Sequence, residues 1–130
     1  MTIWMLALLL LASLAGTPPA LSAKGSVLFW EDVGEPAYRL DRMITQLEQA
    51  GTFDRLRGMV IGSLGPREGD APDALRVWAA ERFRGAPFPV AMNLPGGHLS
   101  RPRTLPLGIQ VAFDPGNGSG LTYLEPGVRP

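Results

Sequence analysis

The stretch GSVLFWEDVGEPAYRLDRMITQL, residues 25–47, joins an apolar run to a helical pattern through two carboxylates. The run 26–30 is bounded by a glycine and by Glu31 and Asp32, which predicts a short strand buried on both faces in the centre of a sheet. Apolar residues then recur at three- and four-residue spacing, which predicts a helix over 36–50. Two carboxylates at the end of a buried strand are unusual, so this junction is the first place to look for function.

The same two patterns alternate along the rest of the chain. The expected elements are a second buried strand over 58–64, a helix over 72–83 and a third strand over 88–92. A long loop over 93–104 and a hairpin of 107–113 with 121–124 follow. This order predicts an α/β fold, with a small mixed sheet, helices packed against it and a C-terminal β-hairpin. The loop 93–104 is long for so small a domain, and long ordered loops often carry function.

Charge and composition exclude several classes of site. Twelve acidic and twelve basic residues balance, so no net charge favours nucleic acid as a partner. There is no cysteine and only one histidine, which leaves no thiolate nucleophile and makes a metal site built on imidazoles improbable. We therefore expect neither a metal nor a cofactor.

Residues 3–15 form an uninterrupted apolar block with two interpretations. The block has about the length of a signal-peptide core, and Ala20-Leu21-Ser22 offers small residues for cleavage, although no basic residue precedes it. It is equally typical of a buried helix that ends at Gly16. On either interpretation the chain divides into an apolar helix or leader, 1–23, and a domain, 24–130.

Glu31 and His98 are the candidates for chemistry. His98 is the only side chain whose ordinary pKa suits proton transfer near neutral pH, and a carboxylate can hold an imidazole in the tautomer that accepts a proton from a hydroxyl. Simpler explanations exist for both: an ion pair of Glu31 or Asp32 with Arg39 or Arg42, and a solvated loop histidine. No serine lies in a G-x-S-x-G or comparable strand-turn-helix setting, the serines being Ser13, Ser22, Ser26, Ser63, Ser100 and Ser119.

Five segments carry a likeness to a known family. They are LASLAGTP (11–18), GSVLFWEDVGEPAYRLDRMITQLEQAG (25–51), GMVIGSL (58–64), GGHLSRPRTLPLGIQVAFD (96–114) and the following LTYLEPGV. In these segments the chain resembles the C-terminal domain of the LD-carboxypeptidase family of serine peptidases, which includes muropeptide-trimming enzymes and microcin-immunity peptidases. The resemblance covers nearly the whole chain.

The resemblance implies a role for each candidate. Glu31 matches the acid of a Ser-His-Glu triad and His98 matches the catalytic histidine, while the nucleophilic serine of the family lies in a separate N-terminal α/β domain that this sequence does not show. The implied reaction is hydrolysis of an L,D peptide bond, which releases the C-terminal D-amino acid of a murein tetrapeptide in the cytoplasm. The likeness also favours a buried helix between the two domains over an exported leader for 1–23.

The sequence departs from the family pattern at two places. Met5-Leu6-Ala7 stands where the family usually has GGN. Around the histidine, Leu99 replaces a glycine and Pro102 an asparagine. A leucine resists the positive φ that a glycine adopts freely, so the local geometry of this loop needs inspection.

Two hypotheses follow. In the first, the chain is the detached or truncated C-terminal half of a serine-type LD-carboxypeptidase and is inert without the nucleophile-bearing domain. The apolar surface that would contact that domain then favours a homodimer of the isolated chain. In the second, it is a non-catalytic peptide-binding or interaction domain, exported if residues 1–23 act as a signal peptide.

Overall fold

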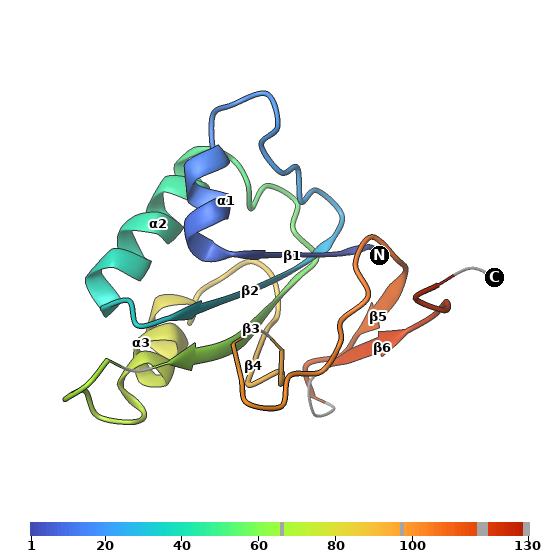
Figure 1. The fold of residues 1–130 in the computed structure, drawn as a ribbon. Helices are drawn as coiled ribbons and strands as arrows, with labels where there is room; N and C mark the ends of the chain where they lie inside the picture. The colour runs from blue at the N-terminus through green and yellow to red at the C-terminus, as the bar shows by residue number, and fades with distance from the viewer. Residues whose placement is uncertain (66, 97, 117–119, 129–130) are drawn as a thin grey trace.

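The computed structural model describes residues 1–65, 67–96, 98–116 and 120–128, and for residues 4–6 it describes the backbone alone. The elements, in chain order, are β1 (Ile3–Ala7), α1 (Leu8–Leu14), β2 (Val27–Val33), α2 (Ala37–Gln49), β3 (Gly58–Gly65), α3 (Ala74–Arg82), β4 (Val90–Met92), β5 (Val111–Phe113) and β6 (Leu121–Tyr123) (Figure 1).

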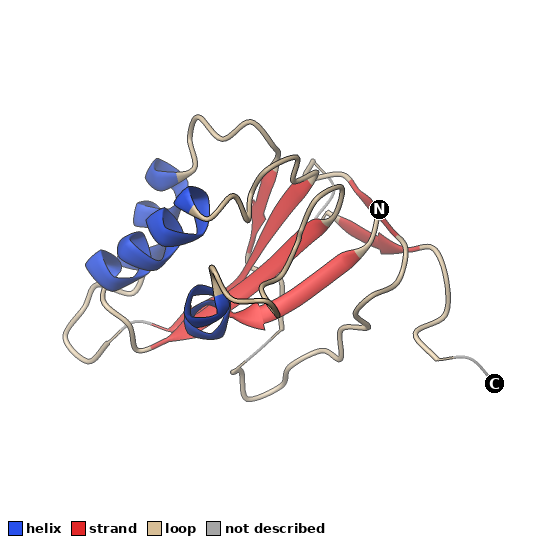
Figure 2. Cartoon of the chain, turned by 90° about the horizontal axis from the view of Figure 1, so that it is seen from above, coloured by secondary structure: helices blue, strands red, loops and turns tan. Residues whose placement is uncertain are grey.

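Strands β1 to β4 form one parallel sheet in sequential order, and β2 lies inside it as predicted. The three helices cover one face of this sheet, and the hairpin β5-β6 lies on the other side (Figure 2). The predicted α/β class with a C-terminal hairpin is confirmed. The antiparallel strands form a two-stranded sheet of their own, so parallel and antiparallel pairing are separated.

The prediction of a helix throughout the first apolar block is wrong for its first half. Residues 3–7 are an edge strand in parallel register with β2, from Ile3 opposite Val27 to Ala7 opposite Glu31, and the helix begins only at Leu8. Pairing with β2 satisfies the backbone of a run whose apolar residues show no period, so sheet hydrogen bonds decide the conformation. The strand and the helix of residues 1–23 thus pack against elements of residues 24–130.

Backbone contacts hold this edge strand on its outer side as well. Ile3 donates to the carbonyl of Ile109 at 3.2 Å and accepts from Gly108 at 2.8 Å, and Val111 donates to the carbonyl of Met1 at 2.7 Å. The segment that leads into the hairpin therefore covers an edge that would otherwise be open for pairing. In the described part of the chain, no helix combines the length and apolar character needed to cross a bilayer.

The central strand contributes to two separate cores because its side chains alternate between faces. Leu28 and Trp30 pack under the helices with Met59 and Ile61 of β3. Val27 and Phe29 face the opposite way, into a smaller core that also holds Ile3, Val60, Leu94 and Val111. By the same alternation, the next residue on the face of Phe29 is Glu31.

Candidate active site

Glu31 is a buried carboxylate near the end of the central strand. It belongs to β2, shares the face of Val27 and Phe29, and is 5% exposed. The prediction that the strand stops at this residue is wrong, because β2 continues to Val33. Burial on a fully packed strand fixes the position of this side chain more firmly than a loop would.

A register shift between β2 and β3 occurs at the position of Glu31. Trp30 lies opposite Ile61, but Asp32 lies opposite Leu64, so β3 carries one extra residue at this point. A Cβ on Gly62 would lie 2.6 Å from the Phe29 ring and 3.2 Å from the Glu31 Cβ. The glycine is therefore required for the close approach of β3 to Glu31.

The long loop after β4 presents His98 above the same face of the sheet. Leu94 anchors the beginning of the loop in the smaller core at 5% exposure. Gly96 then permits a close fold: a Cβ there would lie 2.6 Å from Leu105 and 3.1 Å from the Phe29 ring. A hydrogen bond from the Arg103 N–H to the Pro95 carbonyl, at 2.8 Å, closes the loop on itself.

This folding brings Glu31 and His98 together across 67 positions of sequence. Nδ1 of His98 lies 3.0 Å from Oε1 and 3.0 Å from Oε2 of Glu31, and the His98 backbone N–H donates to Oε2 at 3.4 Å. The Glu31 side chain is 6% exposed and that of His98 is 71% exposed. The predicted contact is confirmed, while the catalytic role of the two residues stays a prediction.

The carboxylate determines the state of the imidazole. An ionised carboxylate only accepts hydrogen bonds, so the proton of a neutral His98 resides on Nδ1 and Nε2 becomes the free acceptor. The hydrogen bond to Glu31, and then its charge, raise the pKa of His98 above its ordinary value. The pair can therefore take a proton through Nε2 and stabilise the resulting imidazolium.

Asp32 lies on the opposite face of β2 and forms no hydrogen bond with His98, although its charge adds a little to the rise in the pKa of His98. Its Oδ1 accepts from the Val33 N–H at 2.8 Å, whereas its buried Oδ2 has no partner among the described residues. Burial is the main cause that raises the pKa of Asp32. The two adjacent carboxylates thus have different roles, because alternation along a strand sends them to different faces.

The simpler explanations do not describe the pair. Arg39 pairs with Glu35 one helical turn away, at 3.2 Å, and within the described residues Arg42 forms no ion pair with either carboxylate. The predicted ion pair of Glu31 or Asp32 with Arg39 or Arg42 is therefore wrong. His98 is exposed, as a solvated loop histidine would be, but it is bonded to a buried acid. Within the described residues, which leave out Ser119, no serine hydroxyl hydrogen-bonds to the imidazole.

The substitution of leucine at position 99 does not strain the loop. Among the described non-glycine residues, only Arg55 and Asn93 have a positive φ. Leu99 instead lines a hollow of about 210 Å³ with Ser63, Asn93, Leu94 and Pro95. The leucine therefore gives this hollow beside His98 an apolar wall.

Sequence reasoning missed two residues that support the pair. Phe29 lies under both Gly62 and Gly96, so one fully buried ring contacts the strand beside Glu31 and the loop that carries His98. The signal for Gly62 was present in the sequence, because a glycine inside an apolar strand often marks a bulge or a close approach. Phe29 gave no such signal.

Comparison with known proteins agrees with this architecture. A family model described as the LD-carboxypeptidase C-terminal domain matches residues 6–113. A putative carboxypeptidase of Streptomyces coelicolor is 38% identical over 122 residues, which span 93% of this chain and 38% of that protein. The murein tetrapeptide carboxypeptidase of Pseudomonas aeruginosa is 38% identical over 101 residues, which span 75% of this chain and 33% of that protein.

Solved structures show the same fold. The crystal structure of muramoyltetrapeptide carboxypeptidase from Oxalobacter formigenes matches with a TM-score of 0.70 and 32% identity, over 85% of this chain and 40% of that one. The microcin C7 self-immunity protein in complex with aspartyl sulfamoyl adenosine matches with a TM-score of 0.81 over 98% of this chain and 38% of that one, at 21% identity, a likeness of fold alone. The match to the family model extends over most of the described fold, from β1 to β5: the chain belongs to the LD-carboxypeptidase family, of which it represents the C-terminal domain.

Proposed function

We propose that this chain supplies the general base of a serine-type LD-carboxypeptidase that acts in the cytoplasm on murein tetrapeptides. The observation that supports the proposal is the exposed imidazole of His98, held at Nδ1 by both oxygens of the buried Glu31 carboxylate. In this arrangement Nδ1 is occupied by Glu31 and Nε2 is left to accept a proton from a hydroxyl. Glu31 would orient the ring and stabilise its charged form.

The serine nucleophile would come from the N-terminal domain that the family resemblance assigns to it. The chain spans 38% and 33% of the length of the two curated relatives above, so a larger enzyme has room for such a domain. His98 would take the proton of the serine as it attacks the L,D peptide bond, and then give this proton to the amine of the departing D-amino acid. Without the serine no acyl-enzyme forms, and a His-Glu pair acting on water alone would be far slower.

The proposed base works in its neutral form, and this gives the reaction a pH dependence. Because the pKa of His98 is raised by Glu31, a larger share of the imidazole is protonated near neutral pH than in an ordinary histidine. The ratio kcat/KM is therefore expected to rise with pH through the raised pKa of His98. Loss of the Glu31 charge would move this rise of kcat/KM to lower pH and would also lower the maximal rate.

Reconstitution tests the proposal. The purified chain is incubated with a murein tetrapeptide, alone and with the separately produced N-terminal part of the Pseudomonas aeruginosa enzyme, and the released D-amino acid is quantified. We expect release only in the mixture. Release by the chain alone that a serine-directed reagent stops would contradict the proposal, and the intact Pseudomonas enzyme serves as the positive control.

Variants of the pair assign the activity to this chain. In the reconstituted mixture, His98→Ala is expected to abolish release, and Glu31→Gln to lower it by roughly 10²–10⁴-fold, the range typical of general acid-base groups. The matched control is Glu68→Gln, at an exposed glutamate that has no hydrogen bond or ion pair with Glu31 or His98. Equal activity of the His98→Ala and unchanged chains would refute the role of this histidine. Tight tetrapeptide binding without release in any mixture would support the alternative, a non-catalytic binding domain.

Exposed leucines on α1 support a partner surface. Leu9 is 58% exposed and Leu10 is 54% exposed, although Leu8 and Leu11 of the same short helix are buried. We propose that this apolar side of α1 is covered by another part of the enzyme or, in the isolated chain, by a second copy, which gives a homodimer. Sedimentation of the chain and of a Leu9→Ser/Leu10→Ser variant tests this: the variant is expected to be monomeric, and a monomeric unchanged chain at high concentration would contradict the proposal.

A further inference from the structure

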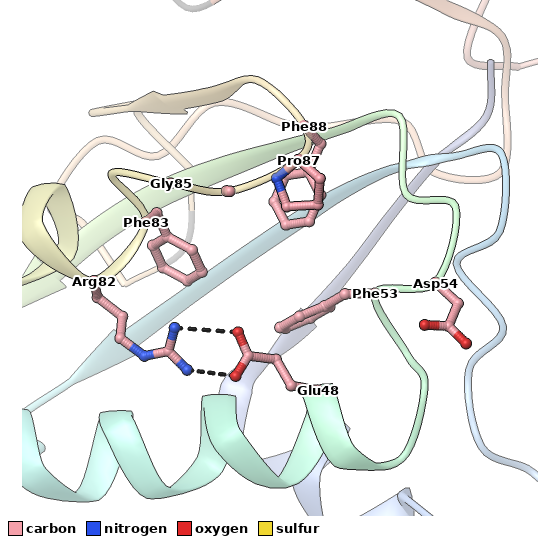
Figure 3. A pocket seen from close by; sticks show the side chains of 9 residues that line it. Glu48, Phe53, Asp54, Arg82, Phe83, Gly85, Pro87 and Phe88 are labelled. Atoms are coloured by element: carbon pink, nitrogen blue, oxygen red, sulfur yellow. Dashed lines mark hydrogen bonds and ion pairs between the residues drawn. The ribbon is translucent and has the colours of Figure 1, made fainter.

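A second pocket lies at the opposite end of the sheet from Glu31 and His98. It is formed by the end of α2, the segment before β3, the end of α3 and the turn before β4, and has a volume of about 370 Å³ (Figure 3). This volume is within the range of sites that hold small molecules. The pocket lies where β3 and β4 begin, whereas Glu31 lies near the end of β2, so the two sites do not overlap.

Three phenylalanine rings give the pocket an apolar lining. Phe53 and Phe83 are 9% and 7% exposed, and both belong to the larger core. The rings of Phe53 and Phe88 meet edge to face with centroids 6.2 Å apart. The Phe83 ring packs on the buried Trp30 ring, and the two ring centroids are 6.5 Å apart. Because these rings are held by the core, the pocket exists before any ligand enters.

The cation at the rim is already neutralised. Arg82 donates two hydrogen bonds to the Glu48 carboxylate, at 3.1 and 2.6 Å (Figure 3). It donates a third to Asp41 at 2.8 Å. Glu48, and then Asp41, raise the pKa of Arg82, so this guanidinium stays charged and paired. It therefore has little capacity to attract an anionic ligand.

The unsatisfied charge of the pocket is negative. Asp54 is exposed at the rim, and among the residues that the structure describes its carboxylate takes part in no hydrogen bond or ion pair. The lining residues carry two carboxylates and one guanidinium, a net charge of 1 − 2 = −1. Aromatic faces attract cations as well, so the lining and the rim favour the same sign of ligand charge.

We propose that this pocket binds a small organic cation: a primary amine or guanidine on an aromatic or branched aliphatic body. The body would lie on the rings of Phe53 and Phe88, and the cationic group would reach the carboxylate of Asp54. Anions of the same shape are excluded by the unpaired charge of Asp54. This binding is separate from the proposed peptidase chemistry, because neither Glu31 nor His98 lines the pocket and no lining residue forms a hydrogen bond or ion pair with either.

The test uses 2-phenylethylamine as the probe and the whole 130-residue chain labelled with ¹⁵N. Titration is expected to give saturable amide shifts confined to residues 53–54 and 82–88, with a millimolar Kd. The control ligand is 3-phenylpropionate, which has the same ring and a similar length but a carboxylate in place of the amine. It is expected to give no saturable shift at these residues.

Two variants show whether Asp54 and the rings act as proposed. Asp54→Asn is expected to weaken amine binding at least five-fold, and Phe88→Leu to weaken it while the spectrum stays that of a folded chain. Glu68→Gln, at an exposed glutamate outside the pocket, is the matched control and should bind as the unchanged chain does. The proposal is overturned if the amine gives no saturable shifts, if amine and carboxylate bind equally, or if Asp54→Asn leaves the Kd unchanged.

Discussion

Glu31 and His98 meet in one contact but belong to different kinds of structure. Glu31 lies on the central strand, where Phe29 and Gly62 fix its position from below and beside it. His98 lies on an exposed loop whose neighbouring residues are held by a few contacts, among them the packing of Leu105 on Gly96. The difference teaches that the acid is positioned by the core of the domain, whereas the base is positioned largely by the acid itself.

The largest effect is expected at Phe29, because its ring supports both the strands around Glu31 and the loop that carries His98. Phe29→Ala removes a fully buried side chain and is expected to lower the free energy of unfolding by about 3–5 kcal/mol. Urea denaturation followed by circular dichroism measures the loss. A loss below about 1 kcal/mol would show that the smaller core does not hold the pair in place.

A substitution at Gly62 tests the packing around Glu31 alone. In Gly62→Ala the new Cβ would lie 2.6 Å from the buried Phe29 ring, so we expect a loss of about 1–3 kcal/mol from overpacking. Gly85→Ala is the control, because a Cβ there meets nothing within 4 Å, and it should leave stability unchanged or raise it by up to about 1 kcal/mol. Equal effects of the two substitutions would contradict the close approach of β3.

A substitution at Leu105 tests the packing of the loop that carries His98 alone. Leu105→Ala removes the contact with Gly96 from a half-buried position, and the expected loss of unfolding free energy is only about 1 kcal/mol. Amide hydrogen exchange should become faster in the loop around His98 and stay unchanged in β2 and β3. If exchange in β2 rose as much as in the loop, the two sides would not be mechanically separate.

The parts of the fold that follow from local pattern were predictable. The periodicity of α2 and the apolar runs of β2 and β3 gave elements whose bounds agree within one to three residues with the observed Ala37–Gln49, Val27–Val33 and Gly58–Gly65. The strand Ile3–Ala7 was not predictable in this way, because an apolar run without a period does not distinguish a strand from a helix. Its pairing with β2 is a tertiary effect.

The candidate site was predictable in its residues but not in its geometry. Glu31 at a strand end and the single histidine were visible in the sequence, and the family resemblance gave them their roles. The bulge opposite Glu31 and the ring of Phe29 under both sides of the pair depend on contacts between strands that no local pattern encodes. The hairpin forms a sheet of its own and does not join the parallel sheet. This separation likewise depends on which strand edges are covered by other segments.

The pH dependence of stability gives a smaller effect. The folded pKa of His98 is raised above the ordinary value of about 6.5, so the folded chain binds more protons than the unfolded chain between these two values. The contribution of the pair is therefore full below about pH 6.5 and is lost as pH rises through the folded pKa. Unfolding curves at several pH values should show this decline in the unchanged chain and not in His98→Ala. The same decline in both would assign it to other groups.

The central claim, that Glu31 holds and polarises the imidazole of His98, is tested most directly by the pKa of this single histidine. An NMR titration of the ring protons reports it without interference, because the chain has no other histidine. The account predicts a pKa above about 6.5 in the unchanged chain and a return toward that value in Glu31→Gln, with Glu35→Gln as a matched control that keeps the raised value. Equal pKa values of His98 in the unchanged chain and in Glu31→Gln would contradict the account.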